Sequence, residues 1–186
     1  MAAPHRLHPA RRVVAKGGLI AYPTEAVFGL GCNPYDASAV ARLLAVKRRP
    51  VSKGLIVLAS DFAQLEPLLA PLSDQLLDTV TATWPGPVTW LLPARPEVPN
   101  WLRGTHDSIA VRVTDHPGSR ALCEAFGGAI VSTSANPATL PPARNPLKVR
   151  SYFGNAPVMI LHGPLGGRAQ PSEIRDGRSG RLVRAG

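Results

Sequence analysis

The sequence predicts a single α/β domain over residues 1–186, with an open, largely mixed or parallel sheet flanked by helices. Two observations predict this fold class. Short apolar runs that suit buried strands alternate with segments of helical spacing along the chain, and that order is typical of α/β domains. The 186 residues contain no internal repeat and no linker long enough to divide them, and a chain of this length can bury a core of its own.

The first elements follow from apolar spacing and from glycine and proline. Residues 1–16 are basic and contain no acid, as in a transit peptide, but apolar residues at helical spacing before Gly17-Gly18 favour an ordinary first helix. The apolar run 19–22 predicts a buried strand that Pro23 ends. Residues 28–31, Phe-Gly-Leu-Gly, are interpreted as part of a strained turn after this strand.

The remaining elements are predicted in the same way. Further helices are predicted at 36–47 (with Asp36 as N-cap), 61–69, 73–82, 117–126 and 146–153. Further strands are predicted at 55–59, 88–92, 108–113, 129–133, 158–161 and 181–184. Proline and glycine predict a rigid turn at 84–87, loops at 93–107 and 134–145, and a flexible connection at 163–167.

Composition narrows the functional classes. Hydrophobic residues make up 45% of the chain and charged residues 18%, which indicates a globular protein, and no apolar run approaches the roughly 18 residues of a membrane helix. Cys32 and Cys123 have no CxxC partner, so we expect free thiols in a reducing compartment, by default the cytoplasm. The five histidines show no metal-ligand spacing, and no metal site is predicted in the protein itself.

The net charge of +9 predicts affinity for polyanions, either nucleotides or nucleic acids. Residues 42–53 hold five cations and no acid, and a second basic stretch runs from Arg144 to Arg184. No phosphate-loop, dinucleotide-binding, HExxH or GxSxG signature is present. A nucleotide site in this chain must therefore be built in another way.

Three polar features could carry chemistry, and each has a purely structural alternative. Lys47, Arg49 and Lys53 could bind a triphosphate, or could simply satisfy a helix C-terminus. Residues 132–137, Ser-Thr-Ser-Ala-Asn-Pro, could bind a small polar ligand, or could form a turn after a strand. Arg112, inside an apolar strand, could bind a ligand carboxylate; otherwise it faces outward or pairs with a nearby aspartate, Asp107 or Asp115.

In their order and spacing, the motifs resemble the YrdC/TsaC family. The motifs are Tyr22-Pro-Thr-Glu25, Gly29-Leu-Gly31, Lys47-x-Arg49-Pro50, Trp84-Pro-Gly-Pro87, Ala110-Val-Arg112 and Ser134-Ala-Asn136. The similarity runs from about residue 18 to residue 186, and the chain resembles the short bacterial form of the family. The resemblance implies a twisted α/β sheet around a positively charged, basic cavity.

The resemblance also implies an enzyme, a nucleotidyltransferase that joins L-threonine, bicarbonate and ATP into threonylcarbamoyl-AMP and releases pyrophosphate. A separate tRNA-modifying transferase complex would receive this adenylate and form threonylcarbamoyladenosine (t6A) in tRNA. Mg²⁺ is expected to accompany the triphosphate. Positioning and charge stabilisation should dominate such a reaction.

Site residues are implied by the same resemblance. The catalytic residues are Lys47, Arg49, Ser134 and Asn136. The ATP-binding residues are Lys47, Arg49, Lys53, Ser108, Ser134 and Arg184. The threonine-binding residues are Thr24, Arg112, Ser132 and Ser172. The chain departs from the family pattern at Ala26, which replaces a threonine, and at 137–139, where a serine and a glycine are lost.

The alternative function is an RNA-binding module without catalysis, acting on double-stranded RNA, tRNA or the ribosome. The charge of +9 supports it, whereas the aromatic content of 5% leaves little material for stacking on bases. Binding to a phosphate backbone needs only charge and would weaken steeply with salt.

Overall fold

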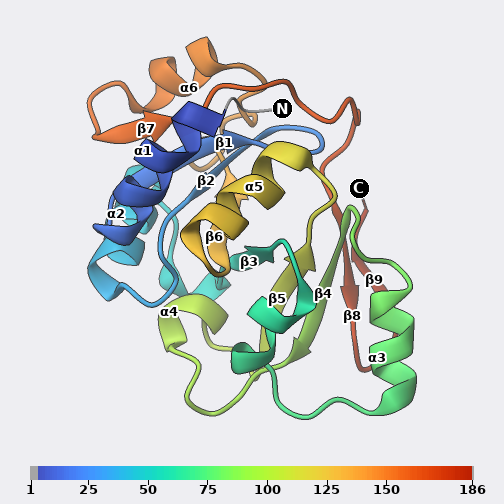
Figure 1. Ribbon diagram of the computed structural model, residues 1–186. Coiled ribbons are helices and arrows are strands. Elements are labelled where there is room, and N and C mark those ends of the chain that lie inside the picture. Colours follow the sequence, from blue (N-terminus) through green and yellow to red (C-terminus); the bar gives the residue numbers. More distant parts are fainter. Residues whose placement is uncertain (1–3, 186) are drawn as a thin grey trace.

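The computed structural model describes residues 4–185, and within them nine strands form one sheet in the order β7-β1-β2-β6-β3-β5-β4-β8-β9 (Figure 1). The strands are β1 (Leu19–Pro23), β2 (Phe28–Gly31), β3 (Ile56–Ala59), β4 (Val88–Pro93), β5 (Ser108–Val113), β6 (Ile130–Ser134), β7 (Val158–Ile160), β8 (Glu173–Asp176) and β9 (Leu182–Arg184). The helices are α1 (Pro4–Ala15), α2 (Ala37–Lys47), α3 (Asp74–Thr81), α4 (Asn100–Arg103), α5 (Pro117–Phe126) and α6 (Pro146–Phe153). The predicted α/β class, with an open sheet flanked by helices, is confirmed.

The sheet is mixed, with more antiparallel than parallel pairs. Among the described strands, β1–β7, β3–β5 and β4–β8 are parallel. The pairs β1–β2, β2–β6, β3–β6, β4–β5 and β8–β9 are antiparallel. Strand β6 joins the two halves of the sheet, because its residues 130–132 pair with β3 and its residues 133–134 pair with β2.

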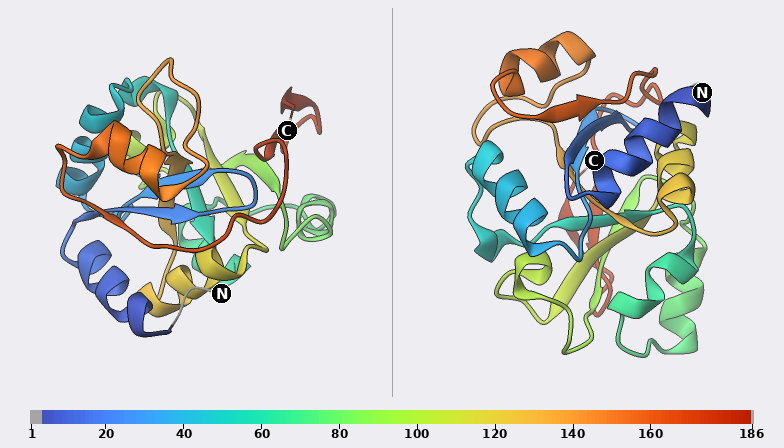
Figure 2. Two further views of the ribbon diagram at one scale, coloured as in Figure 1. Left: turned by 90° about the horizontal axis from the view of Figure 1, so that it is seen from above. Right: turned by 60° about the vertical axis from the view of Figure 1, so that its left-hand side comes forward.

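Successive side chains of a strand point to opposite faces of the sheet, so the core consists of two clusters, one on each face. Val57, Val111 and Val131 point to one face of the sheet, where they belong to the larger core cluster together with residues of α2, α4 and α6. Leu58 and Ile130 point to the other face and pack with residues of α1 and α5 in a smaller cluster. Figure 2 shows helices on both sides of the sheet, with α1 and α5 adjacent to each other on the same side.

Several helices begin at the residue that the sequence indicates. The Asp36 carboxylate accepts a hydrogen bond from the Ala39 amide at 2.9 Å and caps α2, as predicted. Helix α5 ends at Gly127, which adopts a left-handed φ of 83°. In residues 4–185, no helix is both long enough and apolar enough to cross a bilayer.

Four interpretations of the sequence are wrong. Residues 28–31 form strand β2 rather than a turn, and residues 173–176 form strand β8, which was not predicted. The predicted helix at 61–69 is two short 3₁₀ helices, Phe62–Gln64 and Glu66–Leu68, because Pro67 supplies no amide hydrogen to continue a helix. The predicted loop at 93–107 contains the short helix α4.

The glycines of β2 explain its unusual composition. A Cβ on Gly31 would lie 2.1 Å from the Val131 carbonyl oxygen of β6. Cβ atoms on Gly29 and Gly31 would each lie 3.1 Å from the buried ring of Tyr22. Strand β2 therefore needs glycine so that Tyr22 and β6 can both pack against it.

Candidate active site

A cavity of about 440 Å³ opens on the face of the sheet that also carries the smaller core cluster. Strand register explains its floor, since partners in adjacent strands point to the same face. Ala110 is opposite both Ile56 and Leu91, and Ile56 is opposite Ser132. Helices α1 and α5 pack against one part of this face through apolar side chains. The part of the face that they do not cover forms the floor of the cavity.

Nearly all of the charged side chains that line the cavity are cations. Its charged lining residues are Arg49, Lys53, Arg103, Arg112 and Arg184, with Glu25 as the single acid among them. Burial, together with the positive charges of Arg112 and Arg49, lowers the pKa of Arg184 below its ordinary value. Guanidinium groups from distant parts of the sequence thus repel one another here, and an anion would relieve that repulsion.

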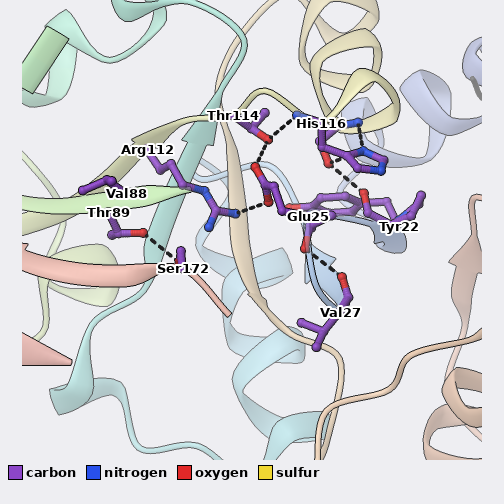
Figure 3. A network of polar contacts seen from close by, with 12 residues as sticks. Tyr22, Glu25, Val27, Val88, Thr89, Arg112, Thr114, His116 and Ser172 are labelled. Atoms are coloured by element: carbon purple, nitrogen blue, oxygen red, sulfur yellow. Dashed lines mark hydrogen bonds and ion pairs between the residues drawn. The ribbon is translucent and has the colours of Figure 1, made fainter. Parts of the chain in front are cut away.

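Arg112 lies at the boundary between the cavity and the core, where it forms an ion pair with Glu25. Its Nη2 lies 3.3 Å from Glu25 Oε2, and each side chain is only 7% exposed (Figure 3). The partner of Arg112 is therefore neither of the two aspartates that the sequence left open. Asp107 pairs with Arg178 instead, at 2.7 Å.

Glu25 is held on its other side by Thr114. The Thr114 hydroxyl donates to Glu25 Oε1 at 2.5 Å and accepts from the His116 amide at 3.2 Å (Figure 3). Burial alone would raise the pKa of Glu25, but Arg112 and the Thr114 hydrogen bond outweigh it and the pKa lies below its ordinary value. Burial and the Glu25 charge raise the pKa of the neighbouring Asp115.

The backbone around Glu25 is fixed by the segment that follows β7. Gly166 N donates to Thr24 O at 3.0 Å, and Arg168 N donates to Glu25 O at 3.0 Å. A Cβ on Gly166 would lie 2.9 Å from the Glu25 Cα, so this contact requires glycine. The connection at 163–167, predicted to be flexible, is hydrogen-bonded to the site.

The structure brings most of the predicted site residues together. The cavity is lined by Thr24, Arg49, Lys53, Ser108, Arg112, Ser132, Ser134, Ser172 and Arg184. Some of their hydroxyl groups already have partners: Thr24 Oγ1 donates to Val27 O at 2.7 Å, and Ser172 Oγ lies 3.1 Å from Thr89 Oγ1. Ala26, where the family pattern has a threonine, also lines the cavity.

The predicted phosphate-binding cations also shape their own loops. Arg49 donates to Gly54 O at 2.9 Å and so closes the turn after α2. Arg184 Nη2 donates to Ser172 O at 2.7 Å and links the last strand to the segment before β8. Arg49 is half-buried and Arg184 is exposed, and these hydrogen bonds hold both in the cavity wall before any ligand binds.

Lys47 and Asn136 are not among the lining residues. The Lys47 ammonium donates to the carbonyl oxygens of Ser134 and, at 2.7 Å, of Asn136. Burial, and to a lesser extent the charge of Arg49, lowers the pKa of Lys47 to about 8. Asn136 Nδ2 donates to Pro137 O and Leu140 O. Both side chains stabilise the loop after β6 from behind the cavity.

The sequence pointed to the segment containing Glu25 but gave that residue no role. Arg103 and His106, which also line the cavity, were not predicted, because nothing in the loop 93–107 marks them out. Among the described residues, no three His, Cys, Asp or Glu side chains are grouped as metal ligands. The arrangement can bind an anion with several charges beside a smaller polar ligand, and it offers hydroxyl donors to both.

Comparisons with known proteins show the family of the chain. The family model described as Sua5/yciO/yrdC, telomere recombination, matches residues 12–186. A protein of Nitrosococcus oceani named threonylcarbamoyl-AMP synthase is 54% identical over 185 residues, which cover 99% of this chain and 100% of that protein. One of Halorhodospira halophila with the same name is 53% identical over 181 residues, covering 97% and 95%.

A solved structure of P. abyssi Sua5 complexed with L-threonine has the same fold. The TM-score is 0.85 and the identity is 32%, with 92% of this chain and 51% of that chain covered. The present chain therefore spans about half the length of that protein.

Proposed function

This chain belongs to the Sua5/YciO/YrdC family over residues 12–186, and from that premise we propose that it is a threonylcarbamoyl-AMP synthase. It joins L-threonine, bicarbonate and ATP into threonylcarbamoyl-AMP and releases pyrophosphate. The observation that carries this proposal is the identity of more than half of the residues, over 97% and 99% of this chain, with two proteins of that name. The cavity supports it, because its charged lining residues are mainly cations and its lining also includes Arg112 and several hydroxyl side chains.

The residues divide between the two larger substrates. Arg49, Lys53 and Arg184 would bind the triphosphate, helped by the hydroxyl groups of Ser108 and Ser134. Threonine would lie deeper, with its carboxylate on Arg112. The side chains of Thr24, Ser132 and Ser172 surround that position.

Arg112 is suited to this role because its hydrogen bonding is incomplete. Its buried Nε has no acceptor among the described residues. A carboxylate from the substrate would supply that acceptor in the planar geometry that guanidinium prefers.

The chemical step requires positioning more than acid–base catalysis. The carboxylate of a threonine carbamate would attack the α-phosphorus of ATP, and pyrophosphate would leave. The cations of the cavity would offset the charge that develops on the phosphate oxygens. Lys47 and Asn136 would act with Arg49 and Ser134 as catalytic residues, in this structure by shaping the loop 134–136.

Magnesium would enter with the nucleotide. The cavity has one carboxylate, Glu25, which is already engaged by Arg112 and Thr114, so its residues do not form a Mg²⁺ site of their own. We therefore treat Mg²⁺–ATP as the substrate. The adenylate would pass to a tRNA-modifying transferase complex, and we expect the protein in the cytoplasm, where ATP and tRNA are available.

The proposal is tested by pyrophosphate release from ATP, with threonine and bicarbonate each present or omitted. Release should require both. A folded protein that releases no pyrophosphate under any combination would contradict the proposal and favour the RNA-binding alternative. A titration with tRNA at low and high salt would then test that alternative.

A further inference from the structure

Two atoms of the Arg112–Glu25 pair lack hydrogen-bond partners. Among the described residues, Glu25 Oε2 accepts no hydrogen bond and Arg112 Nε donates none, although both atoms are fully buried. Their only mutual contact is the ion pair at 3.3 Å, which involves the other end of the guanidinium, Nη2. Leaving such atoms unsatisfied is costly, and a buried native group without a partner requires an explanation.

The two atoms have opposite requirements. Glu25 Oε2 needs a donor, and Arg112 Nε needs an acceptor. Both residues line the cavity, so a ligand bound there would lie against the pair, and the two atoms would become available to it where it displaces the direct contact between the side chains. A ligand that satisfies both carries a donor close to an acceptor, and the zwitterion of an α-amino acid, with its ammonium group beside its carboxylate, has this arrangement.

The surroundings keep Glu25 in place and keep it charged. Thr114 anchors the second carboxylate oxygen, and Arg168 N anchors the backbone carbonyl. Arg112 and Thr114 together hold the Glu25 pKa below its ordinary value despite burial. The other charged residues that line the cavity are cations, so Glu25 is its one fixed negative charge.

We propose that Glu25 determines substrate specificity by binding the α-ammonium group of the amino acid while Arg112 binds its carboxylate. This inference rests on the proposed function, because threonine is the amino acid that the reaction consumes. After carbamoylation the substrate nitrogen retains one N–H, which can still donate to Glu25. The pair would therefore hold the substrate and its carbamate in one orientation.

The rival explanation is that Glu25 only positions Arg112. The two explanations predict different effects of a Glu25 substitution on the affinity for a ligand that lacks the amine. We would measure binding of L-threonine and of 2,3-dihydroxybutyrate, in which a hydroxyl replaces the amine, by calorimetry with the wild-type protein and with Glu25→Gln. A third ligand, 2-aminobutyrate, keeps the amine and lacks the side-chain hydroxyl.

The wild type should bind threonine at least about tenfold more tightly than 2,3-dihydroxybutyrate, since a charge-assisted hydrogen bond is lost. Glu25→Gln should remove most of this preference, and 2-aminobutyrate should lose affinity by the same factor as threonine. Equal losses for all three ligands would overturn the proposal in favour of positioning alone.

Controls separate the possible failures. Glu124→Gln removes an equal charge from an exposed site on α5 and should leave all three affinities unchanged. If Glu25→Gln does not fold, the wild-type comparison still decides, because equal binding of threonine and 2,3-dihydroxybutyrate contradicts an ammonium site. A wild type that binds threonine and releases pyrophosphate without preferring the amine would contradict this inference alone. Absence of threonine binding would contradict the proposed function itself.

Discussion

Replacing Arg112 with lysine keeps a positive charge beside Glu25 but removes the planar group that can bind a carboxylate through two nitrogens. The KM for threonine should rise about tenfold or more, which corresponds to one charge-assisted hydrogen bond, while the KM for ATP changes by less than about threefold. Initial rates of pyrophosphate release with each substrate varied in turn would measure both constants.

Lysine is the informative substitution, because Arg112→Ala would leave the buried Glu25 carboxylate without a counter-charge and would destabilise the fold. Arg11→Lys, at an exposed position of α1, is the matched control. An equal rise in both KM values for Arg112→Lys would remove Arg112 from the threonine site.

Lys47 should make the free energy of unfolding depend on pH. Its pKa is about 8 in the folded protein and ordinarily 10.5, so between these values the unfolded chain holds a proton that the folded protein has lost. The stability of the wild type should therefore rise with pH in this window, by an amount on the order of 1 kcal/mol, relative to Lys47→Met.

Urea unfolding of both proteins at about pH 7 and about pH 9.5 would measure this difference. The control is Lys16→Met, at an exposed position, and its free energy of unfolding should change with pH as much as that of the wild type. If the free energy of unfolding of Lys47→Met changes with pH as much as that of the wild type, burial does not lower the Lys47 pKa as described.

Single residues also show how far sequence reasoning extends. Arg112 could be identified because a cation in an apolar strand needs a partner. Its partner could not, since Glu25 lies on a turn far away in the chain and only the pairing of β2, β6, β3 and β5 brings the two together. Lys47 was predicted to bind phosphate, whereas the loop after β6 folds back onto it and accepts two hydrogen bonds from its ammonium group.

Among the elements, β2 is a strand whose glycines are required by the close approach of its neighbours, β1 and β6. Gly31→Ala should lower the free energy of unfolding by about 2 kcal/mol or more, because the new methyl group would lie 2.1 Å from a backbone oxygen of β6 that cannot move independently. Thermal and urea unfolding would measure the change.

Gly128→Ala provides the comparison. The new Cβ would lie 3.9 Å from its nearest neighbour. The free energy of unfolding of this variant should therefore stay within about 0.5 kcal/mol of the wild-type value. A neutral Gly31→Ala would mean that β2 and β6 do not approach each other as closely as described.

The elements that the sequence predicted correctly are those whose signals are local. Strand β5 and helices α5 and α6 have the predicted bounds, because an apolar run or a proline and a capping residue define each of them. Strands β2 and β8 were missed because glycine in the first and charged residues in the second hide their pairing. Both strands contribute to the cavity, so the site could be predicted from its motifs but not from its geometry.

Over the whole molecule, the net charge of +9 cannot distinguish a nucleotide enzyme from an RNA-binding protein, because both require positive charge. The fold adds the location of that charge. Burial and the charges of Arg112 and Arg49 lower the pKa of Arg184, so cations from distant parts of the sequence concentrate positive potential at one cavity. Family membership and the cationic cavity together favour the enzyme.

This distribution of charge predicts that salt affects the two substrates differently. The KM for ATP should rise severalfold between about 50 mM and about 300 mM KCl, because screening weakens the attraction between the cavity and a highly charged ligand. Threonine has no net charge, and the contact that we propose for it with the buried Arg112 would be screened much less, so its KM should change by less than about twofold. The measurement is pyrophosphate release at constant free Mg²⁺, with potassium glutamate replacing KCl to separate ionic strength from chloride binding. Equal increases in both KM values would indicate that salt acts on the fold or the chemical step, and that the cations around the cavity do not attract the nucleotide.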